Sequence, residues 1–473
     1  MTYGFLSILP PLLAICLALR SKQVLLSLTL GVFGGWVILD EGNILTAFLH
    51  TAEAIVNVFQ NKGSARTIIF TLLIGVLIQL IQYSGGMRAF VSMVQSKLES
   101  SRSPSSKVQL LTAISGFLIF IESNISVLTV GTTFRPLFDK YKISRQKLAY
   151  LIDSSSAPSC ILFPINAWGA YIMGLIAAFD NLDPFKILLY SIPFNFYPIL
   201  TLALVFYLAA AGKSHGLMRK FDQNIPVELP RVENEKPVKR NGGSNFMVLP
   251  ILVMIISMPV YLVYTGWDYN HTDSYQQLIW NSIGNGSGSS SVLYSVLTSI
   301  IFLAAMMAIK RSISLVGFFE ESLKGMKDML TMAVLMVLAF AIGNVCNELE
   351  TGVYIANISR KWLSPATIPL ILFITSCFVA FSTGTSWGTF AIMISIAVPL
   401  SQTLYLNPYL LIAAVLGGGV FGDHCSPISD TTLISSVASG SDHIDHVRTQ
   451  LPYALFTGGI AAVFYLLAGI IMG

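Results

Sequence analysis

Residues 417–432, GGGVFGDHCSPISDTT, place charged and hydroxyl side chains inside a stretch that is otherwise apolar enough to span a bilayer. The stretch holds the carboxylates of Asp423 and Asp430 and the imidazole of His424, and glycines and a proline interrupt its helical pattern. A single aspartate in the middle of a membrane costs about 2.5–3.5 kcal/mol on insertion scales, so such a cluster indicates an ion or substrate site. It also predicts a broken membrane helix, since irregular backbone is tolerated at this depth only around a cavity or inside protein.

The composition is that of a protein embedded in a membrane. Of the 473 residues, 54% are hydrophobic and only 11% are charged, whereas about a quarter of the residues of a soluble domain are charged. Met1–Arg20 lacks a basic leader and a cleavage site, so we interpret it as a retained first span. The five cysteines show no paired spacing, which argues against a disulfide framework or a zinc site. The net charge of +4 lies in loops and does not indicate nucleic-acid binding.

Apolar segments long enough to cross the hydrocarbon core predict about ten full spans. These lie near residues 4–20, 24–40, 66–84, 146–178, 184–211, 246–264, 291–309, 328–348, 408–437 and 451–472. Two longer apolar stretches, 108–139 and 366–400, carry polar residues at their middles, and we predict that both are re-entrant hairpins. The expected fold is an all-α polytopic membrane protein with two hairpins and two broken helices, 146–178 and 408–437.

The charges in the loops set the predicted topology. Lys and Arg clusters lie on both sides of residues 108–134. The positive-inside rule puts both clusters in the cytoplasm, so the stretch between them must enter and leave on the same side. Residues 212–245 are the only long polar linker and are predicted to be a cytoplasmic tether. Residues 265–289 lack Lys and Arg and are expected outside, and both chain termini are expected in the periplasm.

The two halves of the chain show a diffuse internal repeat. Pro164–Asn166, for example, aligns with Pro427–Ser429. Each half holds an odd number of predicted spans, so the second copy must be inverted, which is typical of secondary transporters with a site at the membrane midplane. We divide the chain into a first inverted repeat, residues 1–211, the linker 212–245, and a second inverted repeat, residues 246–473.

The interrupted segments supply the candidate binding residues. Glycine and proline release backbone carbonyls from the helix, and hydroxyls and amides add neutral oxygens, a ligand set that suits a hard cation such as Na⁺. The half-helix N-termini at such breaks could equally hold a substrate carboxylate. No residue is assigned a catalytic role, and the candidate ion- and substrate-binding residues are Glu122, Ser123, Asn124, Asp153, Ser154, Ser155, Asn166, Thr383, Thr385, Ser386, Asp423, His424, Ser426, Ser429 and Asp430.

Three carboxylates lead this set. Burial disfavours the charged form of a carboxyl group, so Asp153 and Asp430 are expected to hold a proton until Na⁺ displaces it, and Na⁺ is expected chiefly at these two residues. Competition of this kind is sodium/proton exchange. Residues 108–134, the part of the hairpin around Glu122, contain no Lys or Arg, so Glu122 needs a proton, a cation or a solvated cavity.

Several residues also have a purely structural explanation. Ser and Thr in membrane helices commonly donate to the carbonyl of the preceding turn. Asp423 and His424 can pair with each other, and Trp387 can serve as a packing or interface anchor. His443–Arg448 is expected to be a short solvated cytoplasmic loop, with pH regulation as an alternative. Two amphipathic stretches are expected to lie along the membrane surface, namely Asn43–Gln60 and Ser314–Lys327.

Longer motifs carry a family resemblance. Phe381–Phe390 (FSTGTSWGTF) and Gly422–Thr432 (GDHCSPISDTT), together with Lys142–Ser154 (KISRQKLAYLIDS), resemble the NhaC family of sodium/proton antiporters. The resemblance implies the ion-transporter superfamily, a bacterial inner-membrane location, a scaffold that often forms homodimers, and elevator-type alternating access. The chain departs from the family in two places, with Glu122-Ser123 where many members carry an acidic pair and Ser395 where a proline often stands.

The sequence therefore predicts a secondary transporter that exchanges Na⁺ for H⁺, without a cofactor. The alternative is a Na⁺- or H⁺-coupled carrier of a small organic solute, an amino acid or a carboxylate, because the family also includes exchangers of organic acids and the first-half site is rich in serine. A channel is disfavoured because no ring of repeated charges appears. An enzyme is disfavoured because no nucleophile context accompanies His424 and Ser426. The expected partners are the lipid bilayer, the transported ions and a second copy of the chain.

Overall fold

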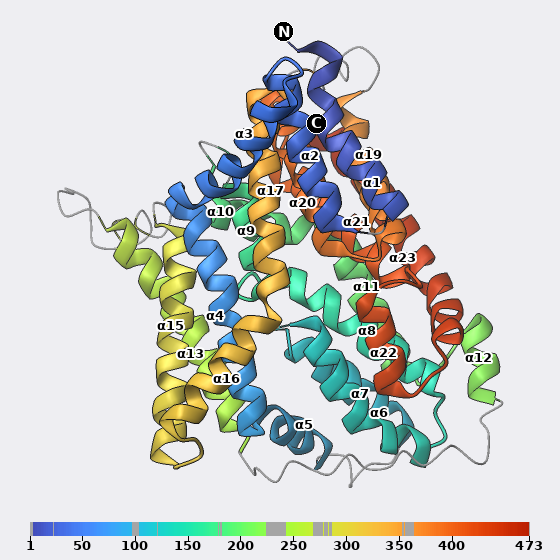
Figure 1. Ribbon diagram of the computed structural model, residues 1–473. Helices are drawn as coiled ribbons and strands as arrows, with labels where there is room; N and C mark the ends of the chain where they lie inside the picture. Colours follow the sequence, from blue (N-terminus) through green and yellow to red (C-terminus); the bar gives the residue numbers. More distant parts are fainter. Residues whose placement is uncertain are drawn as a thin grey trace.

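The computed structural model is built from helices, and the residues that it describes contain no strand (Figure 1). The described residues are 3–21, 23–96, 104–120, 122–177, 182–223, 243–267, 286–351 and 364–472, with Phe179, Leu278, Ser282 and Tyr354 between these ranges. Within them, nine helices are long and apolar enough to cross a membrane, and the bent pair α8 and α9 makes ten. The prediction of an all-helical, multi-span membrane protein is confirmed.

The helices of the first half are mostly short. They are η1 (Gly4–Ile8), α1 (Leu9–Ser21), α2 (Val24–Leu39), α3 (Ile44–Asn57), η2 (Val58–Gln60), α4 (Lys62–Ser84), α5 (Gly86–Ser96), α6 (Pro104–Leu118), α7 (Ser123–Lys140), α8 (Arg145–Leu162), α9 (Ala167–Ala177), α10 (Pro184–Ser191), η3 (Ile192–Phe194), α11 (Phe196–Ala211) and α12 (Gly216–Gln223).

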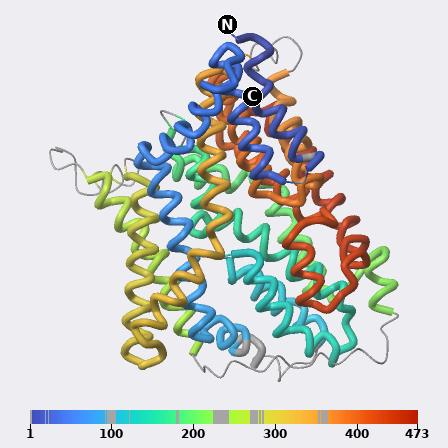
Figure 2. Tube along the Cα trace, in the orientation of Figure 1, coloured from blue at the N-terminus to red at the C-terminus, as the bar shows by residue number. Residues whose placement is uncertain are grey.

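The second half follows after residues 224–242. Its helices are α13 (Asn245–Gly266), α15 (Gly288–Ile309), α16 (Leu315–Asp328), α17 (Leu330–Glu348), η4 (Pro365–Thr367), α19 (Ile368–Thr383), α20 (Ser386–Leu404), α21 (Pro408–Cys425), α22 (Asp430–Ser439) and α23 (His443–Met472). Helices α13 and α15 pack together beside α4, and both ends of the chain lie at the upper end of the molecule in the view of Figure 2.

The helices break where the sequence places glycine, proline and polar residues. Helix α8 ends before Pro164, and α9 continues at an angle of 44°. Gly384 adopts a φ of 69° between α19 and α20, a left-handed conformation that favours glycine. Helix α21 ends at Cys425 and α22 begins at Asp430, with Pro427 between them. Helices α6 and α7 are separated at residues 119–122.

Two sequence predictions were wrong in detail. The span expected over 184–211 is divided into α10 and α11, because Pro193 has no N–H for the helical ladder and a 3₁₀ turn replaces it. The loop expected at His443–Arg448 is instead the start of α23. His446, expected to be solvated, is fully buried there. Its hydrogen bonds to Ser436 and Gln450 explain how a polar ring is accommodated inside the protein.

Helices α19 and α21 approach each other closely at two glycines. A Cβ atom added to Gly418 would lie 2.4 Å from the carbonyl O of Phe373, and one added to Gly422 would lie 2.4 Å from the carbonyl O of Cys377. Only glycine fits at these positions, because real Cβ atoms do not approach a carbonyl so closely. The two helices that carry the breaks at Gly384 and Pro427 are therefore in direct backbone contact.

Other predictions concern parts of the chain that are only partly described. Residues 224–242 of the predicted linker and most of the predicted outer loop 265–289 lie outside the described residues. Helices α19 and α20 are each long enough to cross a membrane by themselves, so the hairpin at 366–400, like that at 108–139 and the inverted repeat, stays a prediction. The two amphipathic stretches do form helices, α3 and α16.

Candidate functional site

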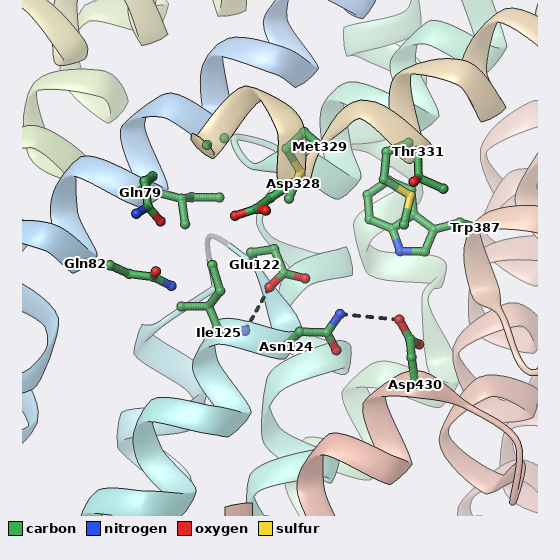
Figure 3. A pocket seen from close by; sticks show the side chains of 14 residues that line it. Gln79, Gln82, Glu122, Asn124, Ile125, Asp328, Met329, Thr331, Trp387 and Asp430 are labelled. Carbon is green, nitrogen blue, oxygen red and sulfur yellow. Dashed lines mark hydrogen bonds between the residues drawn. The ribbon is translucent and has the colours of Figure 1, made fainter. Parts of the chain in front are cut away.

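A cavity of about 430 Å³ lies where α4 and the junction of α16 with α17 meet the N-terminal ends of three other helices (Figure 3). Those helices are α7, α20 and α22, and each starts at one of the chain breaks. The lining consists of Gly75, Ile78, Gln79, Gln82, Glu122, Asn124, Ile125, Gly325, Asp328, Met329, Thr331, Met332, Trp387 and Asp430.

Two of the lining carboxylates are held at helix N-termini. Glu122 caps α7, and its Oε2 accepts a hydrogen bond of 2.8 Å from the backbone N–H of Ile125. Asp430 is the first residue of α22, and its Oδ1 accepts one of 2.9 Å from the N–H of Thr431. The positive ends of the helix dipoles favour a negative charge at both places. In each case one carboxylate oxygen is anchored by the backbone.

Asn124 connects these two carboxylates. Its Nδ2 lies 3.4 Å from Asp430 Oδ2 and donates to it, and the residue follows Glu122 closely in the chain (Figure 3). The amide oxygen, Oδ1, is buried and has no hydrogen-bond partner among the described residues. A buried amide oxygen without a donor is costly and marks a place where a ligand can supply the missing contact.

The charges of the cavity are of one sign. The described residues that line it include three carboxylates, those of Glu122, Asp328 and Asp430, and no Lys or Arg. Asp328 comes from the last turn of α16 and was not among the predicted site residues. Neither were Gln79 and Gln82 of α4, and Trp387, for which the sequence favours a packing or interface anchor, also lines the cavity. An aspartate that ends an amphipathic helix is not beside a break in an apolar segment, which was the sequence signal for the other site residues.

A second polar group of side chains is enclosed away from the cavity lining. His424 lies between two hydroxyls, with Ser154 Oγ 2.8 Å from its Nε2 and Tyr197 Oη 2.9 Å from its Nδ1. Gln450 donates to Asp153 Oδ2 over 2.7 Å and to the carbonyl O of His424 over 2.5 Å. The two carboxylates that were predicted to act together have different surroundings. Asp430 lines the cavity, whereas Asp153 is fully buried in this network.

Asp423 joins two of the chain breaks. Its Oδ2 accepts a hydrogen bond of 3.0 Å from Ser386, the first residue of α20, and its Oδ1 accepts one of 2.5 Å from Ser429, the residue before α22. Ser426 reinforces this connection by donating to the carbonyl O of Phe381 over 2.7 Å. Asp423 and His424 thus bond to different partners and not, as one alternative had it, to each other.

The remaining predicted site residues make local structural contacts. Asn166 donates to the carbonyl oxygens of Phe120 and Cys160 and accepts from the N–H of Gly169, so its amide ties together the breaks after α6 and α8. Thr383 and Ser155 donate to carbonyls of their own helices. Three other predicted residues adjoin the cavity or the His424 network. Thr385 is the N-cap of α20, and Ser123 donates to Glu122 over 3.4 Å. Ser154 bonds to His424, as described above.

Comparisons with known proteins agree that this chain is similar to antiporters. The model of the Na⁺/H⁺ antiporter family matches residues 159–470. An uncharacterized protein of Haemophilus influenzae is 33% identical over 98% of this chain and 90% of its own length. The malate-2H⁺/Na⁺-lactate antiporter of Bacillus subtilis is 25% identical over 36% of this chain and 37% of its own. The Na⁺/H⁺ antiporter NhaC of Alkalihalophilus pseudofirmus is 32% identical over 24% of this chain and 23% of its own.

Solved structures share the fold at low sequence identity. MtrF of Neisseria gonorrhoeae, described as illuminating a class of antimetabolite efflux pumps, superposes with a TM-score of 0.58 at 13% identity over 92% of this chain and 86% of its own. The YdaH transporter of Alcanivorax borkumensis gives a TM-score of 0.56 at 13% identity over 89% of each chain. Both comparisons concern the helical architecture alone.

The predicted resemblance to the NhaC antiporters is confirmed by these matches. The matched region contains the breaks at Gly384 and Pro427, and with them Trp387 and Asp430 of the cavity. The chain belongs to the Na⁺/H⁺ antiporter family and is a secondary transporter embedded in a membrane.

Proposed function

We propose that this transporter exchanges Na⁺ for H⁺ and binds the cation in the cavity between Glu122, Asn124 and Asp430. The observation that carries the proposal is the lining itself. Among the described residues it combines three carboxylates, no basic side chain and the oxygen Asn124 Oδ1, which has no hydrogen-bond partner there. Carboxylate and amide oxygens are the ligands that hard cations prefer. A cation there would satisfy Asn124 Oδ1 and reduce the repulsion between the carboxylates.

The proton would compete with Na⁺ for the same carboxylates. Glu122 and Asp430 each keep one oxygen bound to a backbone N–H. The other oxygen accepts a long hydrogen bond of 3.4 Å, from Ser123 and from Asn124 respectively, which either ion would replace. The anchoring hydrogen bonds hold both groups in place in either state, so exchange of the ions needs no rearrangement of the first turns of α7 and α22. Asp153 was predicted to share this role, but its enclosure in the His424 network favours a separate one.

For the transport cycle we propose an elevator movement in which the helix breaks move as one body. The supporting contacts are the hydrogen bonds of Asp423 to Ser386 and Ser429, which connect the starts of α20 and α22. The proposed moving body would carry the helix pairs α6–α7 and α19–α20 as re-entrant hairpins, past α4 and α16. We further propose a homodimer in a bacterial inner membrane with both termini in the periplasm.

The size of the cavity favours a second candidate function. A volume of about 430 Å³ lies in the range of roughly 300–1,000 Å³ that is usual for small-molecule sites and exceeds the needs of a single Na⁺. The second candidate is therefore a cation-coupled carrier of a small organic solute. Because the lining residues include no Lys or Arg, a solute with an amino group would fit better than a simple carboxylate. The indole of Trp387 could stack on such a cation.

Transport by the purified full-length protein in liposomes that contain a pH-sensitive dye tests both candidates. A Na⁺ gradient is imposed with and without a panel of amines, amino acids and carboxylates. The variant Asp430→Asn removes a cavity charge, and Asp183→Asn is the matched control, because Asp183 caps α10 outside the cavity and Asn caps a helix equally well.

The outcomes separate the two functions. A pH change with Na⁺ alone, lost in Asp430→Asn and kept in Asp183→Asn, supports antiport through the cavity. A pH change that requires one organic solute supports the second candidate. The same Na⁺-driven signal in Asp430→Asn as in the unmodified protein would exclude the cavity as the exchange site.

A further inference from the structure

Two imidazoles and one hydroxyl form a connected path from the edge of the protein to the enclosed network around Asp153. His443 is partly exposed at the start of α23, and His446, one turn later, is fully buried. The hydroxyl of Ser436 lies between them, 3.1 Å from His443 Nδ1 and 2.9 Å from His446 Nδ1. Ser436 belongs to α22, so the path crosses from one helix to another and back.

The other nitrogen of each ring is committed as a donor. His443 Nε2 lies 2.7 Å from the carbonyl O of Pro427, which can only accept. His446 Nε2 lies 2.8 Å from Gln450 Oε1, which also can only accept, since the amide nitrogen of Gln450 donates elsewhere in the network. Each ring therefore carries a proton on Nε2 and, when neutral, has a lone pair on Nδ1.

Counting protons shows what this arrangement lacks. Ser436 has one hydroxyl proton but faces three acceptors, the two Nδ1 lone pairs and the carbonyl O of Thr432 at 2.8 Å. With both rings neutral, at least one Nδ1 lone pair therefore meets the hydroxyl oxygen without a hydrogen between them. One added proton corrects this. It sits on either Nδ1 and is donated to Ser436 Oγ, while the hydroxyl donates to the other ring. The three groups together therefore accommodate one mobile proton.

We propose that His443, Ser436 and His446 form a proton relay between the protein surface and the enclosed network. In one transfer, the N–H bond at His443 Nδ1 breaks as an O–H bond forms at Ser436, and the original hydroxyl proton of Ser436 moves to His446 Nδ1. His443 becomes neutral, His446 becomes positively charged, and Ser436 is unchanged.

The charges around His446 suit a proton that arrives there. Asp153 on α8 faces it, with Oδ2 3.9 Å from His446 Nε2. Asp153 Oδ1 has no hydrogen-bond partner among the described residues, so few contacts stabilise a negative charge on this buried carboxylate. A protonated His446 would supply the missing counter-charge. Besides His443, the imidazole of His424 on α21 also faces His446. Both ring nitrogens of His424 are hydrogen-bonded, one to Ser154 and the other to Tyr197.

The outer end of the relay lies among charges of both signs. Asp442 directly precedes His443 in the chain, and Asp445 lies in the first turn of α23 with it. Arg135 of α7 packs against Gly440 at the end of α22, and Arg145 of α8 donates to the carbonyl O of Gly440. The relay rests on the proposed function for its purpose, because the protons that it carries would be those exchanged for the cation.

Variants of Ser436 test the relay in the full-length protein. Ser436→Ala removes the bridging hydroxyl, and Ser436→Thr keeps it. Ser439→Ala is the matched control, because it removes a hydroxyl from the same helix that donates to carbonyls within α22, accepts from the N–H of Ser441 and contacts neither imidazole in the bonds described here. Two rates are measured in liposomes: Na⁺-driven proton movement, and ²²Na⁺/Na⁺ exchange, which moves no net proton. Proton uptake by the detergent-purified protein after a rapid drop in pH, followed by stopped flow with a dye, needs no transport at all.

We expect Ser436→Ala to slow both Na⁺-driven proton movement and the buried phase of proton uptake by about tenfold or more, since a positioned proton-transfer group typically contributes roughly 10²–10⁴. The rate of ²²Na⁺/Na⁺ exchange in Ser436→Ala should equal that of the unmodified protein. The variants Ser436→Thr and Ser439→Ala should match the unmodified protein in all three measurements. Equal proton uptake in Ser436→Ala and Ser439→Ala would overturn the relay. Absence of Na⁺ exchange in the unmodified protein would instead overturn the proposed function, while the uptake measurement would still decide the relay.

Discussion

Replacing Gly418 by alanine should destabilise the protein by forcing α19 away from α21. The added Cβ would lie 2.4 Å from the carbonyl O of Phe373 and 2.7 Å from Ser376 Cβ, whereas ordinary contact begins near 3.4 Å. One helix must therefore move by about 1 Å. Overpacking of a close-packed interior typically costs about 1–3 kcal/mol. We expect the upper part of this range, because moving the helices apart would also strain the hydrogen bond from Ser426, at the end of α21, to the carbonyl O of Phe381 in α19.

The measurement is the thermal unfolding midpoint of the detergent-purified protein, followed by tryptophan fluorescence, together with the transport rate in liposomes. Gly459→Ala is the matched control, since a Cβ at this position of α23 would meet nothing within 4 Å. The control should be as stable as the unmodified protein or gain up to about 1 kcal/mol from its better helix propensity. Equal midpoints for Gly418→Ala and the unmodified protein would refute the close approach of α19 and α21.

Three further substitutions have expected outcomes. Asn166→Ala should lower the free energy of unfolding by about 2–4 kcal/mol and reduce the yield of folded protein, because the buried carbonyls of Phe120 and Cys160 and the N–H of Gly169 lose their partner. An unfolding midpoint equal to that of the unmodified protein would contradict this. Thr383→Val should leave Na⁺ transport unchanged, since its hydroxyl bonds only to Val379 of its own helix, and a changed Na⁺ dependence would make it a ligand. Glu122→Gln should weaken Na⁺ binding by about tenfold or more, measured by Na⁺-dependent thermal stabilisation, because one of the charges that favour the cation is lost; unchanged Na⁺ dependence would place the cation elsewhere.

The sequence predicted the places at which the helices break. Gly384 and Pro427 mark two of the breaks, and Pro164 marks a third, because each releases backbone groups that a continuous helix would use. Polar residues beside such breaks identified Glu122, Asn124 and Asp430, which do line the cavity. Their place at a cavity was predictable because a buried charge or amide at a break needs a polar partner wherever the rest of the chain lies.

The contribution of distant helices was not predictable from sequence. Asp328 and Gln79 reach the cavity only because α16 crosses α4, and nothing local to either residue indicates that crossing. Asp153 and Asp430 looked equivalent in sequence, yet Gln450 of α23 encloses the first while the second stays at the cavity. His446 was assigned to a solvated loop because hydropathy cannot distinguish a polar turn in water from a polar turn bonded inside the protein.

If the cavity is the exchange site, as proposed, its carboxylates also determine whether membrane voltage can act on this transporter. The lining contains more than one carboxylate, so under the proposed exchange the number of protons that replace one Na⁺ is not fixed at one by the lining. An equal exchange moves no net charge and responds only to the two concentration gradients. Each additional proton makes the cycle carry one elementary charge, on which 100 mV acts with about 2.3 kcal/mol. That energy corresponds to roughly a fiftyfold shift in the ion gradient that the transporter can sustain.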